Sequence, residues 1–310
     1  MILEPVYGPH PSRCFGASLG VDPVSFSRGC YMACAVCHSL RQARALKSYT
    51  TGELAERVAR DLAEREVKVN TIYVYGSSDP FLYDDLARLL RELRRISDSV
   101  NARLVTRTPG YFQRAVDEVL EVVDTLLIPF YVADMEWDSL YQPRTNTTKS
   151  EYYRKLHELF SRARSYEKLV LEIIVARKGP ESVLGGYLDE YIVQARRIGA
   201  KRVFLKTIDR PVRDQGIKPV SRRVLDMVRE KLESEGVEVL ACQRTQGVHR
   251  VKSKKAFVEV YNHILRKPLR VSEVSEVYGD FGVMAAENLV DKKVASKVVW
   301  ENQLYYVPSR

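Results

Sequence analysis

The chain has 310 residues, 45% of them hydrophobic and 29% charged, which is ordinary for a folded soluble protein with one large and one small domain. No apolar run approaches the roughly 20 residues that cross a bilayer, and the start lacks a signal-peptide pattern, so we expect a cytoplasmic protein with reduced thiols and no membrane partner. The net charge of +9 favours an anionic partner such as nucleic acid, although the basic residues are spread along the chain.

From residue 51 onward, segments with helical periodicity alternate with short apolar segments. Thr50 and Glu53 form the pattern of a capping box at the start of the first helix. The predicted helices are 51–65, 86–96, 111–123, 150–165, 186–199 and 221–236. The predicted strands are 71–75, 102–108, 125–132, 168–176, 202–208 and 237–242.

Strands that alternate with crossover helices predict a parallel sheet with right-handed connections. There are about six or seven such units over residues 15–242, fewer than the eight of a closed barrel of about 250 residues. We therefore predict an α/β fold, a partial (β/α)6-type parallel barrel over residues 1–245. Ligands of such folds bind in the loops that follow the strands.

The pattern changes after the last predicted strand. A basic linker over 246–255 contains the run RVKSKK, and residues 256–310 read as three short helices and a hairpin around Glu301 and Asn302. This order resembles a winged helix-turn-helix domain. Such a domain could bind nucleic acid through its basic residues, contact another protein, or serve as a packing lid.

Three of the five cysteines, Cys30, Cys34 and Cys37, stand in the spacing C-x3-C-x2-C. Structural zinc needs a fourth ligand, and His38 is too close to Cys37 for an unstrained tetrahedron. A redox dithiol of Cys34 and Cys37 would leave Cys30 without a task. Haem attachment through Cys34-Ala-Val-Cys37-His38 needs export, for which no signal is present.

A fourth interpretation is a [4Fe–4S] cluster held at three corners. Clusters are normally held by four thiolates, so three cysteines leave one iron open for a ligand. The spacing and its surroundings resemble the radical S-adenosylmethionine (SAM) superfamily, and within it an archaeal and bacterial Fe–S oxidoreductase branch related to wybutosine tRNA-modifying enzymes. The matching residues before the cysteines are Ser12, Arg13, Gly16, Ser18, Leu19 and Gly20.

The resemblance implies what the cluster does. Its open iron would chelate SAM, and one electron from a donor such as ferredoxin or flavodoxin would cleave SAM to a 5′-deoxyadenosyl radical. The chain departs from the family at Val36, where an aromatic residue is usual, and at Gly76–Pro80, where the family has a Gly-Gly-Glu type of turn. Only Cys14 and Cys242 remain for a second cluster, which is too few, so the wybutosine reaction is not expected.

Six further residues are predicted to bind SAM. The turn of Gly76, Ser77, Ser78 and Asp79 follows a strand and is predicted to hold the ammonium group, although an ordinary β-to-α turn has the same residue types. The resemblance places other SAM contacts near Thr106 and Glu172. Their alternatives are a strand threonine and a core glutamate paired with a base such as Lys206, because a buried carboxylate needs a partner.

Two loop arginines could also bind a ligand, and the class of substrate has still to be predicted. Arg144 and Arg210 follow strands and could bind a carboxylate or phosphate, but arginines in loops are more often solvated. The sequence identifies no catalytic side chain. We expect a radical SAM enzyme that modifies RNA or another nucleic acid; the alternatives are a peptide, protein or small metabolite as substrate, or a non-enzymatic Fe–S DNA-binding redox sensor. The low share of Asn and Gln suits a thermophile.

Overall fold

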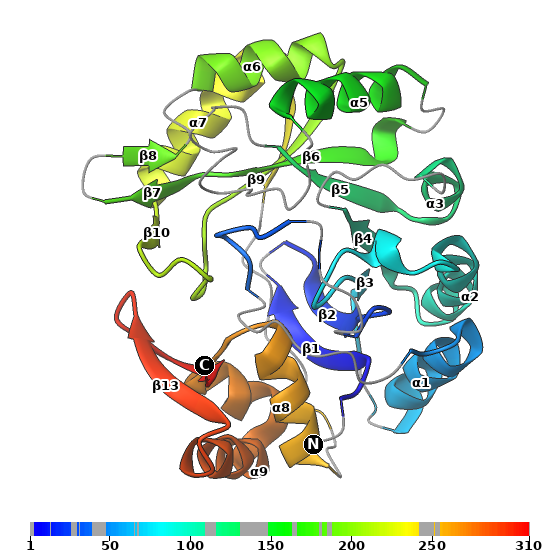
Figure 1. Ribbon diagram of the computed structural model, residues 1–310, viewed down its shortest axis with the longest axis vertical. Helices are drawn as coiled ribbons and strands as arrows, with labels where there is room; N and C mark the ends of the chain where they lie inside the picture. Colours follow the sequence, from blue (N-terminus) through cyan, green and yellow to red (C-terminus); the bar gives the residue numbers. More distant parts are fainter. Residues whose placement is uncertain are drawn as a thin grey trace. The chain divides into compact units, whose positions relative to one another are not determined.

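The structure is a computed structural model of the chain (Figure 1). It describes residues 3–12, 14–25, 30, 32–38, 48–64, 66, 68–108, 116–130, 148–162, 166–179, 182–184, 188–241, 251 and 255–309. The chain forms two compact units. Unit 1 comprises Met1–Cys30, His38–Thr106 and Gln243–Arg310, and unit 2 comprises Tyr31–Cys37 and Arg107–Cys242. None of the described helices is both long and apolar enough to cross a membrane.

Unit 1 contains strands that pair in the order β1-β2-β3-β4. Its strands are β1 (Val6–Ser12), β2 (Gly16–Val21), β3 (Thr71–Val74) and β4 (Arg103–Arg107). β1 is antiparallel to β2, whereas β2, β3 and β4 are parallel, with Leu19 opposite Ile72 and Ile72 opposite Leu104. Every residue of β2 is buried, as expected for a strand of a parallel sheet that is covered on both faces.

Two amphipathic helices connect these parallel strands, α1 (Thr51–Glu64) and α2 (Leu86–Ser99). The predicted capping box is confirmed: the Thr50 amide donates to Glu53 Oε2 (2.8 Å), and the Glu53 amide donates to Thr50 Oγ1 (3.2 Å). α1 buries Leu54, Val58 and Leu62 at helical spacing. Burying an apolar side chain of this size contributes about 1.5–3 kcal/mol.

Unit 2 contains parallel strands that pair in the order β5-β6-β9-β11. Its strands are β5 (Thr125–Pro129), β6 (Leu169–Ile174), β9 (Arg202–Lys206) and β11 (Glu238–Ala241). The helices are α3 (Val116–Val122), α5 (Lys149–Arg162), α6 (Leu188–Arg197) and α7 (Arg222–Ser234). A small antiparallel sheet, not predicted from the sequence, has the order β10 (Ile217–Pro219), β7 (Ala176–Lys178), β8 (Ser182–Leu184).

The C-terminal segment belongs to unit 1. It comprises α8 (Ala256–Arg266), β12 (Leu269–Arg270), α9 (Val271–Asp291), β13 (Ala295–Trp300) and β14 (Gln303–Pro308). α9 is interrupted at Gly279, whose φ of 66° is one that glycine adopts without strain. The predicted hairpin is confirmed: Trp300 pairs with Gln303, and the two turn residues, Glu301 and Asn302, both have positive φ.

The predicted alternation of strands and helices, with parallel neighbours in both units, is confirmed. Parts of six predicted elements lie outside the described residues, namely 65, 111–115, 131–132, 163–165, 186–187 and 242, and so does Arg144. The predicted division into a barrel (1–245), a linker (246–255) and a winged-helix domain (256–310) stays a prediction.

Candidate functional site

The cysteine motif supplies three free thiols, Cys30 in unit 1 and Cys34 and Cys37 in unit 2. Cys34 is buried, and the other two are half-buried. Within unit 2 the Cys37 amide donates to the Cys34 carbonyl (3.1 Å), which closes a tight turn between these two residues. Free thiols in this spacing fit an iron–sulfur cluster, whose usual ligands are cysteine thiolates. No three His, Cys, Asp or Glu side chains of the described ranges form a group arranged to hold a metal, so the assignment rests on donor chemistry and spacing.

The segment after β9 holds the cysteine turn in unit 2. The Arg213 amide donates to the Cys37 carbonyl and the Asp214 amide to the Ala35 carbonyl, both at 3.0 Å. Asp214 in turn pairs with Lys178 of β7 at 2.9 Å. The hydrogen bond from Lys178, together with one from the Gly216 amide, lowers the pKa of Asp214 despite the opposing effect of burial.

Of the two remaining cysteines and the two loop arginines, the structure describes Cys14 and Arg210. Cys14 takes part in a disulfide bond and offers no thiolate to a metal. Arg210 is buried and lies 3.3 Å from the carboxylate of its neighbour Asp209, so it is not a solvated loop residue.

The predicted SAM turn follows β3 directly. A Cβ atom on Gly76 would lie 2.4 Å from the side chain of Asp22, so only glycine fits there. The Ser77 amide donates to Asp22 Oδ2 at 3.0 Å. Asp79 is buried, and its Oδ1 accepts from the Phe81 amide (3.0 Å), which caps the short 3-10 helix η1 (Pro80–Leu82). Ser78 is also buried. The turn thus has the local bonds of an ordinary helix start, and its role toward SAM stays a prediction.

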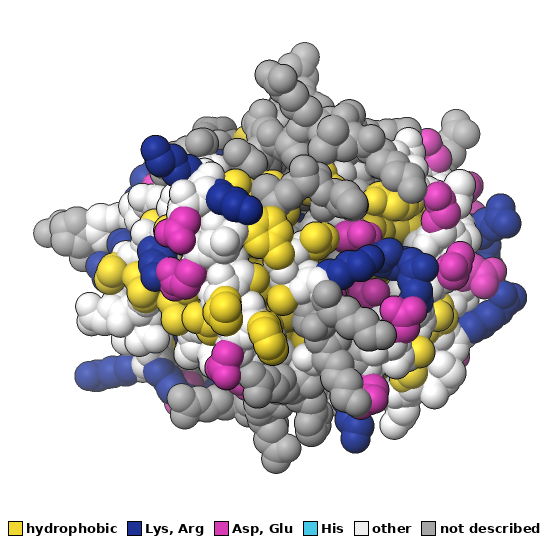
Figure 2. Space-filling model, turned by 90° about the horizontal axis from the view of Figure 1, so that it is seen from below, with side chains coloured by type: hydrophobic (Ala, Val, Ile, Leu, Met, Phe, Trp, Pro, Cys, Tyr) yellow, Lys and Arg dark blue, Asp and Glu magenta, His cyan; other side chains and the backbone are white. Residues whose placement is uncertain are grey.

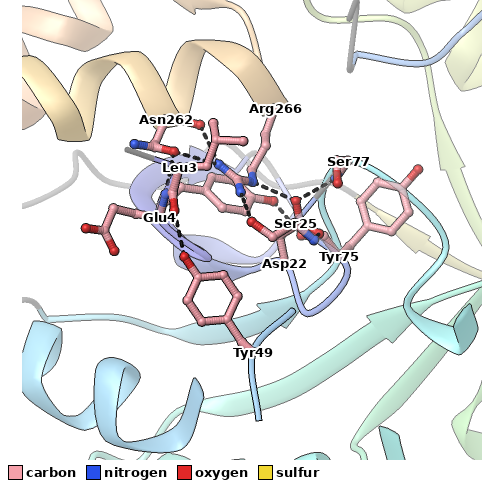
Figure 3. Close-up of polar contacts among 10 residues, drawn as sticks. Leu3, Glu4, Asp22, Ser25, Tyr49, Tyr75, Ser77, Asn262 and Arg266 are labelled. Carbon is pink, nitrogen blue, oxygen red and sulfur yellow. Dashed lines mark hydrogen bonds and ion pairs between the residues drawn. The ribbon is translucent and has the colours of Figure 1, made fainter. Parts of the chain in front are cut away.

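Asp22 and Arg266 were not among the predicted site residues, yet they form a buried ion pair in unit 1. Asp22 comes directly after the buried strand β2, and Arg266 is the last residue of α8. Their side chains are 0% exposed, with Arg266 Nε 2.8 Å from Asp22 Oδ2. The sequence feature that could have indicated Asp22 is its place at the carboxyl end of a buried strand, because ligands bind at those ends in this architecture. Figure 3 shows the pair and its neighbours.

Thr106 lies near the end of β4 and is fully buried. Its hydroxyl donates to the Val74 carbonyl of the adjacent strand at 2.8 Å. The hydroxyl oxygen keeps lone pairs with which it can also accept a hydrogen bond.

Glu172 lies in the interior of β6 and forms a buried charged cluster in unit 2. Its Oε2 is 2.8 Å from Arg107 Nε and 2.7 Å from Arg107 Nη2, and its Oε1 is 2.5 Å from Lys206 Nζ. The buried carboxylate of Glu172 therefore has charged partners, as its burial requires, and one of them is Lys206, the base suggested from the sequence. Burial acts to raise the pKa of Glu172, but the charges and hydrogen bonds of Arg107 and Lys206 prevail and lower it to about 2.

Replacing Glu172 with Gln is expected to lower the free energy of unfolding by about 3–5 kcal/mol at neutral pH, because the buried Arg107 and the half-buried Lys206 lose their counter-ion. Because the folded pKa is depressed, this stabilisation is fully present above pH 4.5 and is lost as the pH falls toward 2. Chemical denaturation at several pH values should show the gap between wild type and variant shrink over that window. Glu158→Gln is the control, since its partner Arg154 is exposed and such pairs contribute up to about 1 kcal/mol. Equal losses in the two variants, or a gap independent of pH, would contradict the assignment.

Comparison with known protein families decides the class of this chain. The model of the radical SAM superfamily matches residues 24–181, a stretch that contains all three motif cysteines. The chain belongs to the radical SAM superfamily. The predicted superfamily and enzyme class are thereby confirmed, as is the α/β fold with an incomplete set of parallel barrel strands. Radical SAM enzymes use a [4Fe–4S] cluster and SAM, and they need a reductant.

Individual relatives are distant. A UPF0026 protein of Helicobacter pylori strain J99 is 21% identical over 309 residues, 98% of this chain and 97% of that protein. Among solved structures, Streptococcus suis SuiB bound to S-adenosylmethionine has a TM-score of 0.48 at 13% identity over 70% of this chain, and the chain spans about half (48%) of SuiB. Spore photoproduct lyase with bound AdoMet and dinucleoside spore photoproduct has a TM-score of 0.46 at 13% identity over 69% of this chain and 74% of that chain. The narrower resemblance to the branch related to wybutosine enzymes stays a prediction.

Proposed function

We propose that this radical SAM enzyme holds its [4Fe–4S] cluster on Cys30, Cys34 and Cys37 and reductively cleaves SAM. The observation that carries the proposal is the presence of three free thiols in the C-x3-C-x2-C spacing within the family match. When bound, the cluster would pass one electron from a ferredoxin- or flavodoxin-type donor to SAM, giving methionine and a 5′-deoxyadenosyl radical. The protein's own part is to hold the cysteine turn, through the Arg213 and Asp214 amides, and to orient SAM.

The SAM ligands that we propose are Gly76, Ser77, Ser78, Asp79, Thr106 and Glu172. The turn of 76–79 follows β3, and Thr106 stands near the end of β4, where ligands bind in parallel barrels. The carboxylate of Asp79 would attract the SAM ammonium, and the hydroxyl of Thr106 would accept a hydrogen bond from the ligand. Glu172 would contact SAM while it remains paired with Arg107 and Lys206, and it would keep these two cations in fixed positions.

Nucleic acid is the substrate class that we propose first. The net charge of +9 supports it, as do the exposed Lys292 and Lys293 directly after α9. The element order of the C-terminal segment, with a hairpin after α9, supports a winged-helix domain that docks the substrate. Phosphate contacts through lysine would make this docking dependent on salt.

A peptide or protein is the second candidate, favoured by exposed apolar side chains of the same segment. Phe281 and Met284 of α9 are 76% and 66% exposed, and Val299 of β13 is 76% exposed. On the face seen in Figure 2, hydrophobic side chains lie exposed among charged ones. Two basic residues that a phosphate could have used are engaged within the protein, since Arg266 pairs with Asp22 and Arg270 donates to the Tyr305 hydroxyl.

Two paired variants should separate these substrates. If nucleic acid is the substrate, Lys292→Gln with Lys293→Gln should weaken RNA binding and reduce the slope of log affinity against log salt by about 1–2. Phe281→Ser with Met284→Ser should leave RNA binding unchanged. The measurement is RNA binding at several salt concentrations, together with 5′-deoxyadenosine formation and the RNA mass after anaerobic incubation with SAM, dithionite and total cellular RNA. The second candidate would be favoured if RNA binding did not depend on salt. It would also be favoured if the enzyme modified a protein substrate and only the variant Phe281→Ser with Met284→Ser lost this activity.

A further inference from the structure

We infer that Arg266 of the C-terminal helix α8 is a positioning residue for the turn of 76–79. The inference rests on the proposed role of that turn in binding SAM. Arg266 does not contact the turn itself; it holds Asp22, and Asp22 holds the turn. All of these residues belong to unit 1, and Figure 3 labels Arg266, Asp22 and, of the turn, Ser77.

The guanidinium of Arg266 is fixed on all its nitrogen atoms. Nε donates to Asp22 Oδ2 at 2.8 Å and Nη2 to Ser25 Oγ at 3.2 Å. Nη1 donates to the carbonyl of Asn262 at 3.1 Å and to its Oδ1 at 3.2 Å. The guanidinium carbon also lies 5.3 Å from the centre of the Tyr7 ring, within the range of a cation–π contact. Such a planar fork cannot be reproduced by a lysine ammonium.

Asp22 carries this fixed position to the turn. The same Oδ2 that accepts from Arg266 also accepts from the Ser77 amide at 3.0 Å. Its Oδ1 accepts from the Ser25 amide at 2.9 Å. Gly76 packs against the Asp22 side chain so closely that no Cβ fits. A displacement of this carboxylate therefore either loosens its bond to the Ser77 amide or shifts the backbone of Gly76 and Ser77.

Tyr7, the aromatic neighbour of Arg266, holds the other flank of the turn. Its hydroxyl donates to the Tyr75 carbonyl at 2.7 Å. Burial, and after it the nearby Asp22 carboxylate, raise the pKa of Tyr7, while Arg266 opposes them. The phenol consequently keeps its proton and remains a donor. The residues on both sides of Gly76 are thus held by side chains that contact Arg266.

The ion pair explains why the turn depends on a helix far away in the chain. Removing the guanidinium would leave a buried carboxylate without its counter-ion, which is strongly unfavourable. Asp22 would then have to rotate or admit water, and either change loosens its bond to Ser77. A purely structural ion pair would stabilise the fold but would leave the turn, and SAM affinity, unchanged in the folded protein.

The test uses three variants, Arg266→Met, Arg266→Lys and the control Arg270→Met, whose arginine contacts Tyr305 and not Asp22. Two readouts are needed: amide hydrogen exchange of residues 75–79 in the cluster-free protein, and equilibrium SAM binding to the cluster-loaded protein. We expect both Arg266 variants to exchange the Ser77 amide faster. We also expect Arg266→Met to weaken SAM binding about tenfold and Arg266→Lys severalfold, at unchanged iron content. Arg270→Met should match wild type.

Arg266→Lys keeps the charge and decides the outcome if Arg266→Met fails to fold. A folded Arg266→Lys protein with wild-type exchange at Ser77 and SAM affinity within about twofold of wild type would overturn the inference. Failure of the proposed function looks different, because wild type itself would then bind no SAM. If wild type binds SAM and Arg266→Lys binds it equally well with unchanged exchange at Ser77, the inferred role of Arg266 is wrong and the proposed function stands.

Discussion

Replacing Cys30, Cys34 or Cys37 singly with Ala is expected to abolish both cluster binding and 5′-deoxyadenosine formation. All three are free thiols, and a cluster that keeps one iron open for SAM cannot lose a further thiolate ligand. Anaerobically reconstituted wild type should contain about four iron and four sulfide per chain, the composition of this cluster type. Iron and sulfide analysis, with detection of 5′-deoxyadenosine after addition of dithionite and SAM, measures the effect.

Cys14→Ser is the matched control for these three variants. Cys14 is disulfide-bonded and not a free thiol, so its loss should affect stability and leave iron content unchanged. A wild-type protein that takes up zinc in place of iron under anaerobic reconstitution would refute the cluster. So would any of the three alanine variants that retains all its iron.

The helices and the strands β3, β4, β5, β6, β9 and β11 could be predicted because their signals are local. The capping box of Thr50 and Glu53 and the apolar spacing of α1 lie within one segment. β1 could not be predicted in the same way, because prolines at 9 and 11 argue against a strand. β1 tolerates them as the terminal strand in unit 1, because among the described residues it pairs on one side, with β2.

The glycine-rich run before the cysteines has a packing reason that the sequence does not show. A Cβ on Gly20 of β2 would lie 2.1 Å from the ring of Tyr7 on the neighbouring strand β1. Gly20 therefore makes room for the ring that also lies against Arg266. The motif resemblance singled out Gly20, and the structure supplies the contact that requires it.

In the candidate site too, contiguous motifs could be predicted from the sequence, whereas contacts between residues far apart in the chain could not. The cysteine spacing and the turn of 76–79 are contiguous, so the sequence alone pointed to them. Asp22 and Arg266 are 244 residues apart, and neither residue, taken alone in the sequence, indicates its partner. For Glu172 the cost of burial predicted that a partner exists, and Lys206 could be suggested, but Arg107 could not.

The pair of Asp22 and Arg266 also limits how substrate docking can be tested. Deleting residues 256–310 would remove α8 with Arg266 and leave Asp22 buried without its counter-ion. A loss of activity in such a truncation would then mix damage to the turn with loss of docking. Surface variants such as Lys292→Gln with Lys293→Gln avoid this, since they leave α8 intact.

Replacing Asp79 with Asn is expected to weaken SAM binding about tenfold to a hundredfold while fold and cluster persist. Asn can still accept from the Phe81 amide through its side-chain oxygen, as Asp79 Oδ1 does at 3.0 Å, and it is an equally good cap. The variant therefore removes the negative charge alone. A charge-assisted hydrogen bond to the SAM ammonium is worth about 1.5–3 kcal/mol, which corresponds to that range of affinity. Equilibrium SAM binding to cluster-loaded protein is the measurement.

Asp79→Ala separates the charge from the cap, because it removes both. Its helix η1 loses the bond to Phe81, so the free energy of unfolding should fall by about 1 kcal/mol in this variant and remain unchanged in Asp79→Asn. If the carboxylate binds the SAM ammonium, both variants lose SAM affinity to a similar extent. If only Asp79→Ala loses it, the side chain acts as a cap, and Gly76–Pro80 is an ordinary turn between a strand and a helix.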